Sequence, residues 1–81
     1  MLPNHAAILD AARESVAAIT GRPVKDQELL ISSGMIDSLS ILKLISDIEK
    51  RLHISIPTDS LQPDDFDTLD LIVETVQRVA R

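Results

Sequence analysis

Residues 34–52 read GMIDSLSILKLISDIEKRL and pass from a flexible glycine through a short polar turn into a helical pattern. From Leu39 onward the apolar residues recur at helical spacing, which indicates an amphipathic helix. Its expected core-facing positions are Ile41, Leu44, Ile45, Ile48 and Leu52. Asp37 is the expected N-cap, because its carboxylate can accept a hydrogen bond from a backbone N–H two or three residues later. The helix must end before Pro57, since a residue that precedes proline is pushed toward extended geometry.

A second helical pattern lies near the start of the chain. Its apolar positions are Ile8, Leu9, Ala12, Val16 and Ile19. A helix is predicted over residues 4–20, with Asn4 as its N-cap. Gly21 followed by Pro23 is the expected stop, because glycine accepts a left-handed conformation and proline cannot continue a helix.

A third helical pattern lies near the end of the chain. Its apolar positions are Leu69, Ile72, Val73, Val76 and Val79, and they predict a helix over residues 68–80. Asp67 with Asp70 resembles a weak capping box before this helix. The acidic run in this region is expected to be solvated surface and consists of Asp59, Asp64, Asp65, Asp67 and Asp70.

The connections between these helices are long or irregular. Residues 21–37 carry a group of apolar side chains that we expect to pin the loop across the bundle, namely Leu29, Leu30, Ile31, Met35 and Ile36. Residues 52–56 alternate apolar and polar, but they have no second strand to pair with and are predicted to form an extended connector. One short helix is expected within residues 58–66, and Phe66 is expected to fill the core.

The whole pattern predicts an all-α domain, a small antiparallel bundle of three long helices and one short helix. A chain of 81 residues is expected to form a single domain over residues 1–81. Hydrophobic residues make up 44% of the chain, which is normal for a globular protein. There is no Cys, so disulfides and thiolate chemistry of the chain itself are excluded.

Charge and size argue against several classes of function. A net charge of −5 argues against nucleic acid as a partner, since phosphate contacts need a basic surface. No apolar run approaches the roughly 20 residues of a membrane span, and no signal peptide is visible, so we expect a cytoplasmic protein. The chain is too small for most enzymes, because little room remains for a deep pocket beside a core. His5 and His53 lack neighbouring ligands at metal spacing, so no metal site is expected.

Ser38 stands at the first turn of the helix predicted after Gly34. A helix N-terminus presents unpaired N–H groups and about half a positive charge, and it favours a phosphate. A phosphodiester on the Ser38 hydroxyl would lie in that field. Asp37 beside it could hold a divalent cation while a transferase attaches the group. The alternative is that Ser38 is an ordinary helix N-cap.

These residues resemble the acyl carrier protein family, which includes peptidyl and D-alanyl carrier domains. The triplet Asp37-Ser38-Leu39 matches the family's attachment motif for 4′-phosphopantetheine, and residues 54–57 match the family at their spacing after it. The resemblance covers essentially the whole chain. It implies a non-enzymatic carrier with 4′-phosphopantetheine, derived from coenzyme A, on Ser38, and with Asp37 and Leu39 as part of the attachment motif. Such a carrier holds acyl, aminoacyl or peptidyl intermediates as thioesters and presents them to partner enzymes.

Two departures from the housekeeping fatty-acid carriers point to a specialised pathway. In those carriers the glycine usually stands two residues before the aspartate, whereas Gly34 stands three before Asp37, as in D-alanyl carriers and several standalone aminoacyl or peptidyl carriers. Those carriers also keep acidic residues along the second helix, where this chain has Lys43, Lys50 and Arg51. Fatty-acid, polyketide, nonribosomal-peptide and D-alanine ester pathways all stay open at this point.

The resemblance implies two kinds of partner, a phosphopantetheinyl transferase and an acyl- or aminoacyl-activating ligase or synthase. It also implies a monomer, which is the default for such a carrier. The expected contact residues on the second helix are Leu39, Leu42, Lys43, Ser46 and Lys50. Leu39 and Leu42 could equally belong to the core, and Lys43 could pair with Asp47 on a solvated face. Apolar cargo could fold between this helix and the last one. A hypothesis from another class is a helical protein-interaction or scaffold domain.

Overall fold

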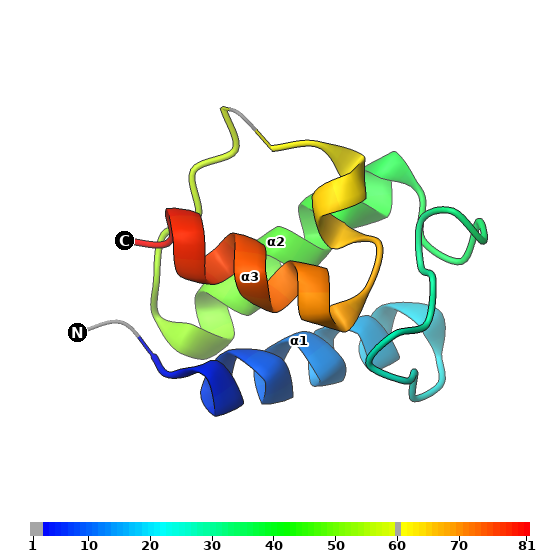
Figure 1. Cartoon of the computed structure of the whole chain (residues 1–81), viewed down its shortest axis with the longest axis horizontal. Helices are drawn as coiled ribbons and strands as arrows, with labels where there is room; N and C mark the ends of the chain where they lie inside the picture. The colour runs from blue at the N-terminus through cyan, green and yellow to red at the C-terminus, as the bar shows by residue number, and fades with distance from the viewer. Residues whose placement is uncertain (1–2, 60) are drawn as a thin grey trace.

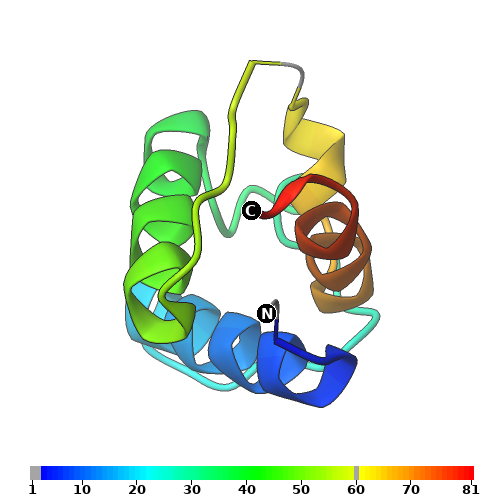
Figure 2. The ribbon, with the colours of Figure 1, turned by 90° about the vertical axis from the view of Figure 1, so that its left-hand side faces the viewer.

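The computed structural model describes residues 3–59 and 61–81, and every regular element in these ranges is helical. The elements are α1 (His5–Thr20), α2 (Ser38–Leu52), the 3-10 helix η1 (Pro63–Phe66) and α3 (Leu69–Val79). α1 packs against α2 and α3, and η1 packs against the same two helices. Figures 1 and 2 show that α2 and α3 lie on either side of α1 and both run opposite to it. The predicted all-α bundle is confirmed.

The ends of α1 follow from short-range signals in the sequence. Asn4 accepts a hydrogen bond on Oδ1 from the backbone N–H of Ala7 at 2.9 Å, which caps the first turn. Gly21 has a φ of 81° and donates its N–H to the carbonyl oxygen of Ala17. This left-handed conformation suits glycine and ends the helix. The predicted cap and stop of the first helix are therefore confirmed.

α2 turns one apolar face toward the core. Its buried positions are Ile41, Leu44, Ile45 and Ile48, as predicted. Leu52 is half-buried at the end of the helix. Leu39 and Leu42 are 75% and 60% exposed, so neither leucine belongs to the core. Phe66 of η1 is buried in the core, as predicted.

Three buried apolar side chains pin the loop between α1 and α2, namely Val24, Leu30 and Ile36. Leu30 and Ile36 are almost fully buried, whereas Ile31 and Met35 are half-buried. The prediction is wrong for Leu29, which is 51% exposed. The loop turns tightly after this residue, and the N–H of Ile36 donates to the carbonyl oxygen of Leu30 at 2.9 Å. In such a turn successive side chains cannot all face the core.

After α2 the chain forms no regular element from His53 to Asp59 and runs extended in Figure 1, as predicted, although Leu52 of the predicted connector is still the last residue of α2. The backbone N–H of Ile56 donates to Oε2 of Glu49 at 2.8 Å, which ties the connector to the end of α2. Ser55 and Arg81 exchange two backbone hydrogen bonds of 2.9 Å each. The short helix expected before Phe66 is η1. In the part of the chain that the structure describes, no helix is long and apolar enough to cross a membrane.

Asp67 differs from both of its predicted roles. The N-cap of α3 is Thr68, whose Oγ1 accepts a hydrogen bond from the backbone N–H of Leu71 at 3.1 Å, so the capping box predicted for Asp67 and Asp70 is wrong. Asp67 is also buried, whereas the acidic run was predicted to be solvated. Its carboxylate turns inward because three backbone N–H groups of the α1–α2 loop point at it. Paired donors make burial of a carboxylate tolerable.

Candidate functional site

Ser38 is the first residue of α2, and its side chain is exposed. The residue before it, Asp37, is the N-cap, since its Oδ1 accepts a hydrogen bond from the backbone N–H of Ser40 at 2.8 Å. The Ser38 hydroxyl is therefore not needed to cap the helix, and it bonds to no other side chain or backbone group among residues 3–59 and 61–81. The interpretation of Ser38 as the N-cap is wrong. Its hydroxyl faces solvent at the positive end of a helix.

The carboxylate of Asp37 is the charged group next to this hydroxyl. The backbone N–H and then the hydroxyl of Ser40 hold the pKa of Asp37 below its ordinary value. Asp37 is therefore ionised near neutral pH, and it is exposed. The Ser40 N–H that Asp37 accepts is one of the backbone N–H groups that have no partner within the helix at its start. The remaining N–H groups at this end of α2 still favour a bound anion. An exposed carboxylate is also the kind of oxygen ligand that Mg²⁺ takes.

The chain approaches Ser38 through a glycine in the left-handed region. Gly34 has a φ of 81°, and no heavy atom lies within 4 Å of the place where a Cβ would stand. The backbone conformation rather than crowding therefore requires glycine here. Two residues before Ser38, Ile36 is buried, and three residues after it, Ile41 is buried as well. Ser38 is thus an exposed side chain held between two core anchors.

A small cavity of about 160 Å³ opens beside Ser38. Its walls on α2 include Ser38, Ile41, Leu42 and Ile45, and its walls on the opposite side include Leu61, Pro63 and Phe66. The space for apolar cargo was expected between α2 and the last helix, but this cavity lies against η1. The reason is that the buried side chains of α3, among them Ile72, Val73 and Val76, belong to the packed core itself.

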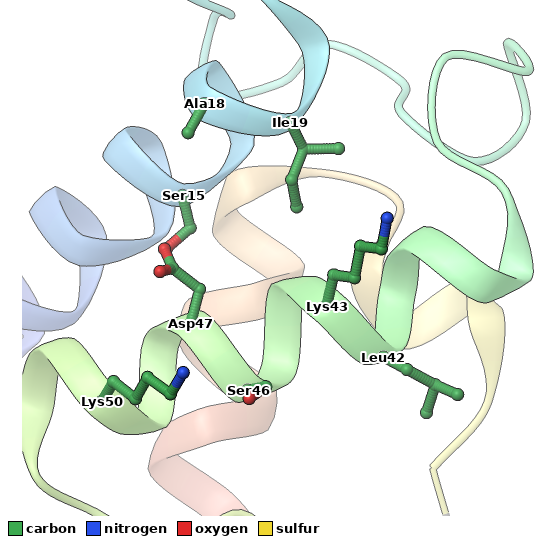
Figure 3. Close-up of a pocket in the computed structure, with 8 residues that line it drawn as sticks. All are labelled: Ser15, Ala18, Ile19, Leu42, Lys43, Ser46, Asp47 and Lys50. Carbon is green, nitrogen blue, oxygen red and sulfur yellow. The ribbon is translucent and has the colours of Figure 1, made fainter.

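A groove between α1 and α2 collects most of the residues predicted to contact partners (Figure 3). The groove is lined by Leu42, Lys43, Ser46, Asp47 and Lys50 of α2 and by Ser15, Ala18 and Ile19 of α1. Leu39 lies outside the groove, exposed beside Ser38. Leu42 lines both the groove and the cavity beside Ser38. It therefore forms the ridge that separates them.

The carboxylate of Asp47 forms hydrogen bonds with Arg51 and Ser15 and not with Lys43. Its Oδ2 accepts a hydrogen bond from Nε of Arg51 at 2.7 Å and another from Oγ of Ser15 at 2.5 Å. These donors, Arg51 first and Ser15 second, hold the pKa of Asp47 below its ordinary value. The Lys43–Asp47 pair considered from the sequence is wrong. Within the described residues neither lysine of the groove forms an ion pair.

Sequence reasoning did not find two residues that organise this region, Ser15 and Asp67. Ser15 is fully buried on α1, and the only signal for it was a serine on an otherwise apolar helix face. Asp67 had no local signal, because the loop groups that it binds lie far away in the sequence.

Comparison with known proteins places the chain in a family. The family model described as "Phosphopantetheine attachment site" matches residues 10–76. The D-alanyl carrier protein of Leuconostoc citreum is 26% identical over 73 residues, which cover 88% of this chain and 94% of that protein. The D-alanyl carrier protein of Streptococcus uberis is 32% identical over 56 residues, covering 69% and 70%. That of Listeria monocytogenes is 26% identical over 74 residues, covering 91% and 90%.

The geometry around Ser38 fits a phosphodiester-linked group. The Ser38 hydroxyl is exposed, lies at a helix N-terminus and makes no hydrogen bond that the fold needs. It can therefore be esterified without disturbing the core. The family model spans most of the chain, including all of α2 and η1 and most of α1 and α3. The chain therefore belongs to the phosphopantetheine attachment family, and it is a carrier protein whose cofactor is covalently attached 4′-phosphopantetheine.

Proposed function

We propose that Ser38 is the attachment residue and that this protein is a non-catalytic cytoplasmic carrier of activated aminoacyl groups. The observation that carries the proposal is the exposed hydroxyl of Ser38 at the start of α2, where Asp37 and not Ser38 performs the capping. The chain has no Cys, so a thioester cargo needs a thiol from outside the chain. When bound, the phosphopantetheine arm supplies that thiol.

Attachment is a phosphoryl transfer from coenzyme A in which Ser38 is the nucleophile. The bond between Oγ and the phosphorus of the phosphopantetheine half forms, and the P–O bond to the bridging oxygen of the coenzyme's pyrophosphate breaks. Adenosine 3′,5′-bisphosphate leaves with that oxygen and the electron pair, and the hydroxyl proton leaves to the transferase or to solvent. The N–H groups at the start of α2 stabilise the phosphodiester that results. Asp37 stays ionised beside the hydroxyl because its pKa is lowered, so it can hold a divalent cation of the transferase complex. Leu39, 75% exposed, offers the transferase an apolar contact next to the reacting atom.

Two observations support an aminoacyl cargo, the small volume of the cavity beside Ser38 and the names of the relatives. The cavity beside Ser38 measures about 160 Å³. This is small against the 300–1,000 Å³, roughly, of pockets that enclose a ligand. A long acyl chain would therefore stay largely outside the described fold, whereas a small aminoacyl group needs no enclosure. The relatives from three genera are named D-alanyl carrier proteins, which supports D-alanine as the first amino acid to test.

The partner surface that we propose consists of Leu39, Leu42, Lys43, Ser46 and Lys50. Four of these five residues line the α1–α2 groove, and Leu39 extends the surface to Ser38. An apolar ridge at Leu42 flanked by two lysines fits an activating ligase with carboxylates around an apolar contact. This local positive charge differs from the net charge of −5 of the whole chain.

Intact mass spectrometry tests the attachment. The wild-type protein, Ser38→Ala and the control Ser55→Ala are incubated with coenzyme A and a broad-specificity phosphopantetheinyl transferase. Ser55 is also exposed, but it lies in the connector after α2. We expect a gain of one phosphopantetheine in wild type and in Ser55→Ala, and none in Ser38→Ala. If the wild-type protein gains no such mass with several transferases, the hypothesis of a helical protein-interaction or scaffold domain is favoured instead.

The modified protein then tests the cargo. It is offered D-alanine, other amino acids and fatty acids, each with an activating ligase and ATP, and the thioester is read by mass and by its cleavage with hydroxylamine. We expect D-alanine to load faster than a fatty acid. Preferential loading of a fatty acid would overturn the aminoacyl assignment and leave the attachment site intact.

A further inference from the structure

Asp67 holds a distant turn of the α1–α2 loop with one carboxylate. Its Oδ1 accepts hydrogen bonds from the backbone N–H groups of Leu30 at 3.2 Å, Ile31 at 2.8 Å and Ser32 at 2.9 Å. Its Oδ2 accepts a hydrogen bond from the hydroxyl of Ser32, and its backbone carbonyl oxygen accepts the N–H of Leu30 at 2.7 Å. One residue thus fixes three consecutive residues of the loop.

The loop and the carboxylate depend on one another. Successive backbone N–H groups that converge on one oxygen form an anion-binding concavity, and here the protein's own side chain occupies it. Asp67 is 9% exposed, and within the described residues it has no cationic partner. If the loop lifted away, a largely buried negative charge would lose its donors, which is costly. These contacts therefore favour the loop position of this structure over positions that separate the loop from Asp67.

This fixed turn leads directly to Ser38. The N–H of Ile36 donates to the carbonyl oxygen of Leu30 at 2.9 Å, so residues 30–36 form a closed unit that begins at the Asp67 contact. Ile36 is buried, and Asp37 then caps α2. The position of the Ser38 hydroxyl is thus tied through one short turn to the carboxylate of Asp67.

The other neighbour of Asp67 is the wall of the cavity beside Ser38. Asp67 directly follows η1, and Pro63 and Phe66 of η1 line that cavity together with Ser38. Asp67 therefore joins two segments that flank the same hydroxyl, the loop before α2 and η1 across the cavity. A transferase that binds the start of α2 therefore contacts both the loop before α2 and η1.

We propose that Asp67 is a positioning residue for the modification of Ser38, a role that rests on Ser38 being the attachment site. It keeps the loop and η1 in the arrangement that the transferase binds, so that the enzyme does not have to order them. A carrier whose binding-competent form is populated one time in ten binds about tenfold more weakly, with the chemical step unchanged once bound.

The test compares Asp67→Asn, Asp67→Ala and the control Glu74→Gln in transferase kinetics, with the carrier as the varied substrate. Glu74 is an exposed acid of α3 that does not line the cavity beside Ser38, so its substitution makes the same change of charge outside the loop and η1. We expect Asp67→Asn to raise KM for the carrier by roughly tenfold, with kcat within a factor of about two. Asp67→Ala should raise it further, because Asn keeps an oxygen acceptor for the loop N–H groups and Ala does not. Glu74→Gln should match wild type.

Amide hydrogen exchange is measured on the same variants, at a temperature where circular dichroism shows each to be folded. We expect exchange of the amides of residues 30–32 to speed up in Asp67→Asn, while amides in the middle of α1 and α3 stay protected. If Asp67→Ala does not fold, Asp67→Asn and Ser32→Ala, which removes one bond of the set, carry the test.

Three results would overturn the inference. They are an unchanged KM although the loop amides have lost protection, an equal rise of KM in Glu74→Gln, and a loss confined to kcat. A wild-type protein that is never modified contradicts the assignment of Ser38 instead. Modification of wild type and Asp67→Asn with equal KM contradicts only the role of Asp67.

Discussion

Ser15 of α1 donates a hydrogen bond of 2.5 Å from its hydroxyl to Oδ2 of Asp47 on α2. The two side chains face one another across the α1–α2 groove in Figure 3. Ser15 is fully buried, and Asp47 also accepts a hydrogen bond from Arg51 of its own helix. The contact therefore joins the helix that carries Ser38 to the helix that packs beneath it.

Removing this hydroxyl should destabilise the fold. Ser15→Ala leaves Asp47 with Arg51 and partly exposed, so we expect the free energy of unfolding to fall by about 1–2 kcal/mol. Urea unfolding followed by circular dichroism measures the change. Ser55→Ala is the control and should stay within about 0.5 kcal/mol of wild type. Equal stability of Ser15→Ala and wild type would show that the bond contributes nothing net.

The stability of the domain should decrease in acid through Asp67. The hydroxyl and then the backbone N–H of Ser32 hold the pKa of Asp67 below its ordinary value. A carboxyl with a lowered pKa stabilises the folded state fully above its unfolded pKa of about 3.9, and this contribution is lost as pH falls through the folded value. We expect the urea concentration at the unfolding midpoint of wild type to decrease as the pH is lowered below about 5. Asp67→Asn should be less stable at pH 7 and should show a shallower acid decline, whereas parallel curves would contradict the prediction.

Alanine substitutions of Leu42 and Leu44 should distinguish a surface leucine of α2 from a core leucine. Leu44→Ala removes a fully buried side chain and should cost about 2–5 kcal/mol of unfolding free energy. Leu42→Ala removes a side chain that is 60% exposed and should change stability by about 0.5 kcal/mol or less. We expect Leu42→Ala nevertheless to slow loading by the activating ligase. Unchanged loading in a folded Leu42→Ala protein would remove this residue from the partner surface.

The charge of the groove should control the rate of encounter with the ligase. The double substitution Lys43→Glu and Lys50→Glu reverses both lysines, and we expect loading at low salt to slow by roughly tenfold or more. Added salt should reduce the difference, because it screens exposed charges. The control that makes the same change of charge is the double substitution Lys25→Glu and Arg81→Glu, at two exposed positions outside the groove. The docking proposal is rejected if this control slows loading as much as the reversal of the two groove lysines does.

Short-range signals account for the elements that the sequence predicted well. Asn4, Gly21 and Asp37 act on backbone groups within four residues, so the start and stop of α1 and the start of α2 could be read directly from the chain. The apolar spacing of α2 likewise identified its buried face. Leu39 and Leu42 were surplus to this face, but the sequence left surface and core equally open for them, and only the fold decided that both are exposed.

The contacts that sequence reasoning misjudged all join segments that are far apart along the chain. Asp67 looked like one more acid in a solvated run, and its role depends on a loop that returns to it after α1. Asp47 has Lys43 within one helical turn, but it bonds to Ser15 across the helix interface and to Arg51. Local spacing gives no information on such partners.

The sequence alone determined the helices, the serine at the start of α2 and the resemblance to carrier proteins, because periodicity, capping and a short motif are properties of neighbouring residues. The tertiary structure alone decided that Asp67 holds the loop before Ser38, that the small cavity lies against η1, and that the groove lysines remain unpaired among the described residues. The physical reason is that buried polar groups must find donors wherever the packed chain places them, and packing brings together residues that the sequence keeps apart.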